Sequence, residues 1–180
     1  MAAVILDGKA IAAKIRQEIE RELAQRPLRP TVAVLSFDSP ASEVYRRVQE
    51  TEAASLWIRM TGTRLAQASQ DAVEQYILRW NQDDRIHGIF VHQPMPPGVD
   101  PQRISALIDP RKDVEGIHPQ NMARRFFARA RIGSCTALAV MRLIEETGEL
   151  LKGKEAVVVG HSEIVGRPVS MLLLDKLQIL

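Results

Sequence analysis

The sequence predicts an α/β protein: a three-layer domain, in which helices cover both faces of a parallel sheet, followed by the start of a second α/β unit. Two observations support this prediction. Short runs of β-branched and other apolar residues alternate with longer amphipathic segments along the first part of the chain, and such alternation is typical of βαβ units. A further apolar run, residues 155–159, then meets a glycine turn and a helical stripe.

The first domain is expected to begin with an amphipathic helix over residues 8–24, which Pro27 and Pro30 terminate. Its apolar residues recur every four positions: Ile11, Ile15, Ile19 and Leu23. We expect strands at 31–37, 59–65 and 88–91, and helices at 41–56, after Ser69, and at 100–108. Ser69 is a suitable N-cap for its helix, which carries Val73, Ile77 and Trp80.

The second unit is expected to follow a long irregular stretch, residues 109–133, so that the two domains cover residues 1–132 and 133–180. Thr136 can cap a helix that runs to about residue 147. Residues 155–159 are then expected to form a buried parallel strand, and residues 164–177 a helix. This helix would expose large apolar side chains unless something covers them.

Composition and charge exclude several classes of protein. With 24 Lys and Arg against 22 Asp and Glu, the net charge is only +2, so nucleic acid is not an expected partner. The arginine cluster at 124, 125, 129 and 131 is better explained as a solvated face. No apolar run approaches the roughly 18 to 20 residues that cross a bilayer, and the first residues lack the pattern of a secretory signal. We therefore expect no membrane association.

Cysteine and histidine usage narrows the prediction further. The single cysteine, Cys135, excludes an intramolecular disulfide, which favours a cytoplasmic protein. The four histidines show no spacing typical of metal ligands, so no metal site is expected.

Polar residues follow the predicted strands, and ligands of parallel sheets bind beyond the carboxyl ends of the strands. Tyr45 and Gln49 lie four residues apart on the helix after the first strand, so they share a face and could stack on and hydrogen-bond a planar ligand. A half-buried tyrosine on an amphipathic helix explains Tyr45 equally well. His92, at the end of the strand 88–91, could be a general base, or a histidine whose ring is satisfied by backbone groups.

Two later segments also carry candidate binding residues. Asp113 and Glu115 could hold an amide-bearing or cationic ring, or they could form surface ion pairs with Arg111 and Lys112. Gly160 lies at a strand-to-helix turn, where helix N–H groups could bind a phosphate, although such turns are also common in proteins without that function.

Taken together, several segments in order and at matching spacing resemble the bifunctional methylenetetrahydrofolate dehydrogenase/methenyltetrahydrofolate cyclohydrolase family. The resemblance spans essentially the whole chain. The segments are residues 5–10 (ILDGKA), 39–42 (SPAS) with Tyr45, 88–96 (GIFVHQPMP), 109–121 (DPRKDVEGIHPQN), 135–136 (CT) and 157–168 (VVVGHSEIVGRP).

The resemblance implies a folate-type catalytic domain and a partial Rossmann-type domain that binds NADP or NAD. Members of the family oxidise the methylene bridge of tetrahydrofolate by hydride transfer and hydrolyse the methenyl product to the 10-formyl form. On this basis the catalytic positions are Tyr45, Gln49, His92 and Glu115. The substrate would contact Tyr45, Gln93, Pro94, Asp113 and Glu115, and the cofactor would contact Thr136, Gly160, His161, Ser162, Ile164 and Gly166.

Three of these positions depart from the family pattern. The family carries a lysine, a glutamine and an aspartate where this chain has Gln49, His92 and Glu115. Gln49 cannot titrate, and loss of a positioned acid or base costs about two to four powers of ten in rate, so we expect no cyclohydrolase activity. His161 replaces a family arginine, and the dinucleotide crevice is truncated, so we expect weak dehydrogenase activity or none.

Two alternatives remain open at this point. The chain could be a non-catalytic folate-binding or assembly protein that pairs, through its apolar C-terminal helix, with itself or with a full-length relative. It could also be a fragment of a longer protein. Since the resemblance implies homodimers, we expect a homo-oligomer.

Overall fold

The computed structural model describes residues 3–126 and 133–177, and the chain divides into two compact units. One unit is Ile19–Val114, and the other combines Met1–Glu18 with Glu115–Leu180. Helix α1 (Gly8–Ala24) contributes to both. The domain boundary expected between residues 132 and 133 borders a stretch outside the described residues and stays a prediction.

The unit Ile19–Val114 is built on a parallel sheet with the strand order β2-β1-β3. Strands β1 (Thr31–Phe37), β2 (Arg59–Leu65) and β3 (Gly88–Val91) confirm the predicted positions. In the register, Val32 of β1 faces both Met60 of β2 and Gly88 of β3. Because β1 is paired on both sides, it is buried along almost its whole length.

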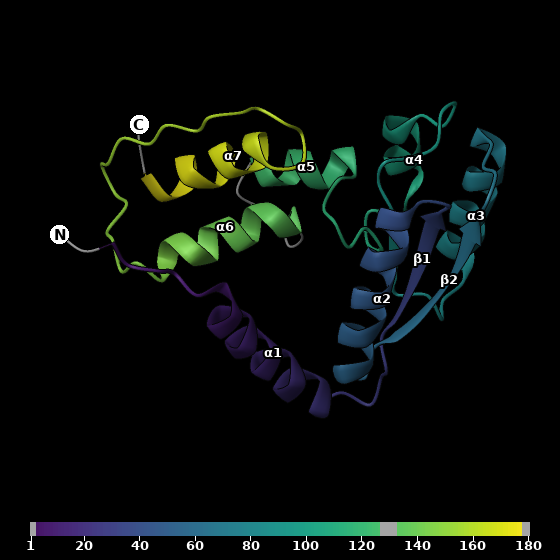
Figure 1. Cartoon of the computed structure of the whole chain (residues 1–180), viewed down its shortest axis with the longest axis horizontal. Helices are drawn as coiled ribbons and strands as arrows, with labels where there is room; N and C mark the ends of the chain where they lie inside the picture. The colour runs from purple at the N-terminus through teal and green to yellow at the C-terminus, as the bar shows by residue number, and fades with distance from the viewer. Residues whose placement is uncertain (1–2, 127–132, 178–180) are drawn as a thin grey trace. The chain divides into compact units, whose positions relative to one another are not determined.

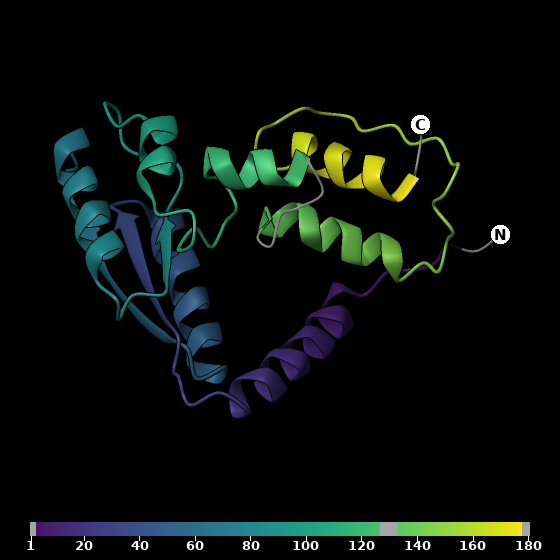
Figure 2. The same ribbon diagram turned by 180° about the vertical axis from the view of Figure 1, so that it is seen from behind.

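Helix α2 (Pro40–Ser55) covers one face of this sheet, and helices α3 (Gln70–Gln82) and α4 (Pro101–Leu107) cover the other (Figures 1 and 2). Each helix begins at a polar cap. Ser39 Oγ accepts from the backbone N–H of Ser42, Ser69 Oγ accepts from that of Ala72, and Asp100 caps α4. The three-layer α/β architecture predicted for the first domain is confirmed.

The core of this unit lies between the sheet and the α3–α4 face. Its members are buried apolar side chains from β1, β3, α3, α4 and the adjoining loops: Ala33, Leu35, Phe37, Val73, Ile77, Trp80, Ile86, Ile89, Val91, Val99, Ile104 and Ile108. Val73, Ile77 and Trp80 are the stripe predicted for α3. This core holds the carboxyl ends of β1 and β3 beside the start of α2.

Helix α1 confirms the predicted bounds, but none of its residues is buried. Its four apolar positions, Ile11, Ile15, Ile19 and Leu23, are only half-buried. Periodicity therefore identified the helix and its apolar face correctly, whereas the extent of burial depends on tertiary contacts.

The other unit contains α5 (Pro119–Phe126), α6 (Cys135–Glu145) and α7 (Gly166–Leu177). Helices α6 and α7 lie side by side in both views (Figures 1 and 2). Their contact is apolar and comprises Ala137, Met141, Val169, Leu173 and Leu177. Lys176 Nζ also pairs with Glu145 at 3.0 Å. Much of the apolar stripe predicted for residues 164–177 is therefore covered by α6.

The strand predicted at residues 155–159 is wrong: these residues carry no strand pairing. Val157 and Val159 are 90% and 97% exposed. A β-strand needs a neighbour for its backbone hydrogen bonds, and no other strand lies among the described residues of this unit. The β-branched run indicates a local preference for extended backbone, but the described residues of this unit offer no strand with which it could pair.

The helices of this unit also differ from the prediction in their starts and in number. Helix α6 is capped by Ser134, whose Oγ accepts from the N–H of Ala137, so Thr136 lies in the first turn instead of at the cap. The stretch 109–133, predicted as irregular, contains α5. Here Nδ1 of His118 accepts from the N–H of Gln120. Histidine is not a usual cap residue, so Pro119, at the first helical position, was the available sequence signal for the start of α5.

The core predicts a sharp difference between two neighbouring residues of α3. Ile77 is fully buried and Leu78 is 45% exposed. We expect Ile77→Ala to lower the free energy of unfolding by about 2–5 kcal/mol, because it leaves a cavity. Leu78→Ala, the matched control, should cost less than about 1 kcal/mol. Urea titration measures both, and equal losses would contradict the assigned core.

Candidate functional site

Three side chains predicted as catalytic come together at the carboxyl end of the sheet. Tyr45 and Gln49 lie on one face of α2, and His92 directly follows β3. The backbone N–H of His92 donates to the carbonyl of Leu35 at 2.9 Å, so the end of β3 is fixed to β1. The positions of these side chains therefore follow from the sheet and from the cap that starts α2.

The imidazole of His92 is held by hydrogen bonds at both ring nitrogens. Nδ1 lies 2.7 Å from Ser42 Oγ, and Nε2 lies 2.9 Å from Gln49 Oε1. The residue is only 1% exposed. We call this arrangement the Ser42–His92–Gln49 chain. The alternative that backbone groups satisfy the ring of His92 is wrong, because the ring partners are side chains of α2.

Aromatic rings surround the imidazole. The Tyr45 ring centroid is 5.4 Å from that of His92 and 6.1 Å from that of Phe90. Phe90 meets His92 edge to face at 5.5 Å. Tyr45 remains 52% exposed, so it has ring surface for a planar ligand while its other contacts fix it beside His92.

The electrostatic environment disfavours a charged imidazole. Burial of the ring and, to a smaller extent, the positive charge of Arg46 hold the pKa of His92 below its ordinary value. At neutral pH His92 is therefore neutral, with one protonated and one unprotonated ring nitrogen.

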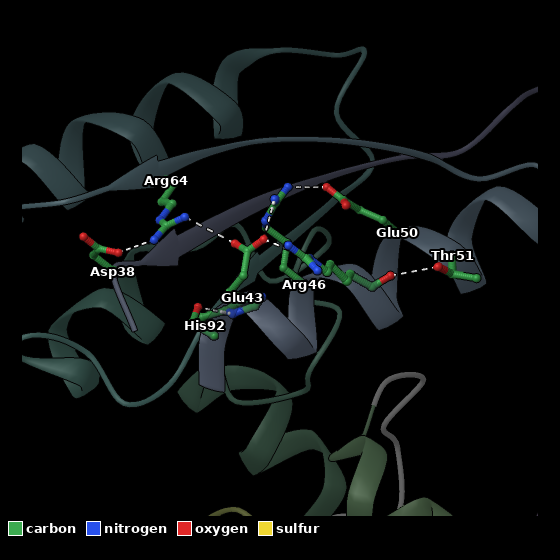
Figure 3. Close-up of polar contacts among 9 residues, drawn as sticks. Asp38, Glu43, Arg46, Glu50, Thr51, Arg64 and His92 are labelled. Atoms are coloured by element: carbon green, nitrogen blue, oxygen red, sulfur yellow. Dashed lines mark hydrogen bonds and ion pairs between the residues drawn. The ribbon is translucent and has the colours of Figure 1, made fainter. Parts of the chain in front are cut away.

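Arg46 belongs to a ladder of ion pairs along α2 and β2 (Figure 3). Arg46 pairs with Glu43 and Glu50, and Arg64 pairs with Asp38 and with Glu43. Arg47 also donates to Glu43, and this contact is the largest cause of the lowered pKa of Glu43. The carboxylates hold the Arg46 guanidinium, whose charge acts on His92.

The predicted substrate residues differ in their settings. Gln93 and Pro94 follow His92 and are exposed. Asp113 is 1% exposed and forms a β-bridge with Ile89, so the alternative of a surface ion pair is wrong for Asp113. Glu115 is half-buried and belongs to the other compact unit. Its convergence with Tyr45, Gln49 and His92 stays a prediction.

The neighbours of Asp113 have other partners. Arg111 pairs with Asp109 at 2.6 Å, an interaction that lowers the pKa of Asp109 to about 2. Lys112 Nζ donates to the carbonyls of Trp80, Asn81 and Asp83 at the end of α3, each at 2.9 Å. These bonds fix the segment that leads to Asp113.

The predicted cofactor residues lie in the loop before α7 and in the first turn of α6. Ser162 Oγ accepts from the N–H groups of Val165 (3.2 Å) and Gly166 (3.3 Å). Gly160 has a φ of 109°, and a Cβ on Gly166 would lie 2.3 Å from the Gly160 carbonyl oxygen. The loop therefore packs closely against the start of α7, which explains both glycines.

This loop does not fit a dinucleotide phosphate as it stands. A phosphate at a helix N-terminus needs free N–H groups, but Ser162 already occupies two of them. His161 and Thr136 are exposed, and Ile164 is 49% exposed. Residues 155–159, which would form the floor of a crevice, are unpaired within the described part of the chain.

Three residues near His92 escaped the sequence analysis as site residues: Ser42, Arg46 and Phe90. The spacing of Ser42, Tyr45 and Gln49 at i, i+3 and i+7 places them on one helix face, so a signal for Ser42 was present. Arg46 acts on His92 only through its charge, which residue spacing does not reveal. Phe90 belongs to the apolar run of β3 and was therefore assigned only to the strand.

In the described residues, no helix is long and apolar enough to span a membrane. The same residues contain no group of three or more His, Cys, Asp or Glu side chains that could hold a metal ion.

Comparison with known proteins gives concordant results for both parts of the chain. Residues 6–115 match the family described as tetrahydrofolate dehydrogenase/cyclohydrolase, catalytic domain, and residues 134–179 match its NAD(P)-binding domain. The bifunctional protein FolD of Acidiphilium cryptum is 42% identical over 97% of this chain and 63% of its own length. FolD 2 of Geobacter sulfurreducens is 40% identical, with the same two coverages.

Solved structures agree in fold. The FolD enzyme of Campylobacter jejuni has a TM-score of 0.91 and 33% identity, over 97% of this chain and 64% of that one. The Trypanosoma brucei enzyme, complexed with NADP cofactor and an inhibitor, has a TM-score of 0.90 and 32% identity over 98% of this chain and 63% of that one. The chain thus spans about 63% of the length of the curated relatives that it matches.

The lowered pKa of His92 predicts a pH-dependent stability. As the pH falls through about 6.5, the unfolded chain takes up the His92 proton before the folded chain does, so stability falls with pH in that window and is fully present above it. We expect the free energy of unfolding to drop more steeply from about pH 7.5 to about pH 5.5 in the wild type than in His92→Gln. His161→Gln, at an exposed position, should follow the wild type. Parallel slopes for the wild type and His92→Gln would contradict the buried neutral imidazole.

Proposed function

Since the chain belongs to the tetrahydrofolate dehydrogenase/cyclohydrolase family, we propose that it binds a folate-type one-carbon carrier beside Tyr45 without hydrolysing the methenyl form. Its dehydrogenase activity is weak or absent. It acts as a diverged homologue that retains the ligand site of the catalytic domain and has lost the proton-transfer group.

The single observation that carries this proposal is the double hydrogen bonding of His92. Hydrolysis of a methenyl bridge requires a group that holds or moves a proton beside the one-carbon unit. Gln49, where the family has lysine, cannot titrate. His92 is the remaining candidate, but Ser42 and Gln49 occupy its two ring nitrogens. No nitrogen lone pair or ring proton of His92 is thus free for water or substrate.

Ligand binding makes smaller demands on the site. Tyr45 offers an exposed ring, and the amide of Gln49 can hydrogen-bond a heterocycle. Neither requires a titrating group. The surroundings of Tyr45 therefore suit retention of a folate better than catalysis on it.

Weak hydride transfer follows from the loop before α7. Hydride transfer depends on orienting the nicotinamide against the folate. Because Ser162 Oγ accepts from the N–H groups of Val165 and Gly166 at the start of α7, a phosphate has to displace that hydroxyl before it binds. NADP or NAD binding by this chain is therefore weak.

The proposal predicts binding without hydrolysis. When the purified protein is mixed with methenyltetrahydrofolate, the absorbance of this compound should decay at the uncatalysed rate, because no general acid or base is available. Calorimetric titration should detect tetrahydrofolate but little or no NADP. Formation of 10-formyltetrahydrofolate at a rate like that of the family would refute the proposal.

A second prediction concerns the aromatic surface. Tyr45→Ala should weaken folate binding about tenfold, or about 1.4 kcal/mol, because the ligand loses its stacking partner. Val44→Ala removes an exposed apolar side chain from the adjacent position and should leave affinity unchanged. Equal affinities for Tyr45→Ala and wild type would place the ligand elsewhere.

A further inference from the structure

Ser42 has no assigned role, yet it is one of the two side chains that hydrogen-bond the His92 ring. It is 6% exposed and lies one helical turn before Tyr45 on the inner face of α2. Its hydroxyl makes the shorter of the two ring contacts, at 2.7 Å. Its backbone N–H is held by the cap residue Ser39, so the start of α2 fixes its position.

We propose that Ser42 is a positioning residue that holds His92 in the tautomer protonated at Nε2, and that the Gln49 amide nitrogen is thereby presented to a hydrogen-bond acceptor of the ligand. The statement about the ligand rests on the proposed function. The statement about the tautomer does not.

The direction of the hydrogen bonds follows from what each atom can do. Gln49 Oε1 has only lone pairs, so its contact with Nε2 requires a proton on Nε2. In a neutral ring Nδ1 then carries the lone pair and needs a donor. Ser42 Oγ is that donor, because a hydroxyl can turn its hydrogen toward Nδ1. If Nδ1 carried the proton instead, the Gln49 carboxamide could rotate and donate its N–H to Nε2, so Gln49 alone does not select the tautomer and the donor at Nδ1 does.

The Ser42–His92–Gln49 chain also determines which end of the Gln49 amide is free. Since Oε1 is engaged by His92, the amide nitrogen lies on the other branch of the carboxamide. Within the described residues no group accepts a hydrogen bond from this nitrogen, and Gln49 is only half-buried. Two N–H donors therefore remain for a ligand.

A neutral donor selects a particular ligand chemistry. An amide N–H pairs with a carbonyl or carboxylate oxygen, and it gives nothing to a ligand group that is itself only a donor. Near Tyr45, the ligand should therefore carry an acceptor oxygen at the one-carbon position. A formyl carrier supplies a carbonyl oxygen, which is a stronger acceptor than the amine nitrogen of a carrier without the formyl group.

Nitrogen NMR of the histidine rings tests the tautomer. The wild type should show a pyrrole-type shift for Nε2 and a pyridine-type shift for Nδ1 of His92, assigned by loss of the signals in His92→Gln. Ser42→Ala should shift His92 toward the other tautomer or a mixture, because Nδ1 loses its donor. Ser42→Thr keeps the hydroxyl and should restore the wild-type pattern, and Ser105→Ala, which removes a hydroxyl bonded to the Gln102 carbonyl, is the matched control.

A ring protonated at Nδ1 in the wild type would overturn the proposal, and so would a Ser42→Ala pattern identical to the wild type. If Ser42→Ala fails to fold, the wild-type and Ser42→Thr spectra still decide, since both must show the proton at Nε2. A merely structural serine would not determine the tautomer.

Binding tests the ligand chemistry separately. Wild type should bind 5-formyltetrahydrofolate about tenfold more tightly than tetrahydrofolate, a difference of about 1.4 kcal/mol, and Gln49→Leu should abolish the difference. If Gln49→Leu keeps the tenfold preference of the wild type, the role of the amide is refuted. Binding of neither ligand would overturn the ligand statement together with the proposed function, while the NMR result would still decide the role of Ser42.

Discussion

The two hydrogen bonds of the His92 imidazole determine the chemistry that the site can perform. A histidine at the end of a parallel strand is well placed for acid–base work. Here, however, the ring is buried and bonded at Nδ1 to Ser42 and at Nε2 to Gln49. Both ring nitrogens are therefore engaged by side chains of the protein. Gln49, whose amide cannot titrate, supplies the oxygen that occupies Nε2.

The fold makes this arrangement rigid. The central strand β1 fixes the end of β3 through the bond from the His92 N–H to Leu35, and the Ser39 cap fixes the start of α2. Helix α2 then brings Ser42 and Gln49, which lie two turns apart on one face, to the ring. The ion pairs of Arg46 with Glu43 and Glu50 hold a positive charge near the imidazole. Secondary structure, packing and charge thus all act on the two ring nitrogens of His92.

Much of the fold could be predicted from local sequence, and what could not depends on neighbours. The three strands and the Ser69 cap follow from short strand-type runs and capping chemistry. Residues 155–159 carry the same run, but the described residues of their unit contain no neighbouring strand. In the site, the face shared by Tyr45 and Gln49 was predictable from their spacing. The hydrogen bonds of His92 were not, because they join residues about fifty positions apart and depend on how α2 packs against the sheet.

Hydrolysis by a double variant tests the central claim most directly. Gln49→Lys combined with His92→Gln restores the residues that the family resemblance implies at both positions, and it removes the ring that engages position 49. In a single-turnover assay with methenyltetrahydrofolate, we predict that this variant exceeds the wild type about a hundredfold or more, the usual contribution of a positioned acid or base. A wild type that already matches the double variant would contradict the account, and so would a folded, folate-binding double variant that stays at the uncatalysed rate.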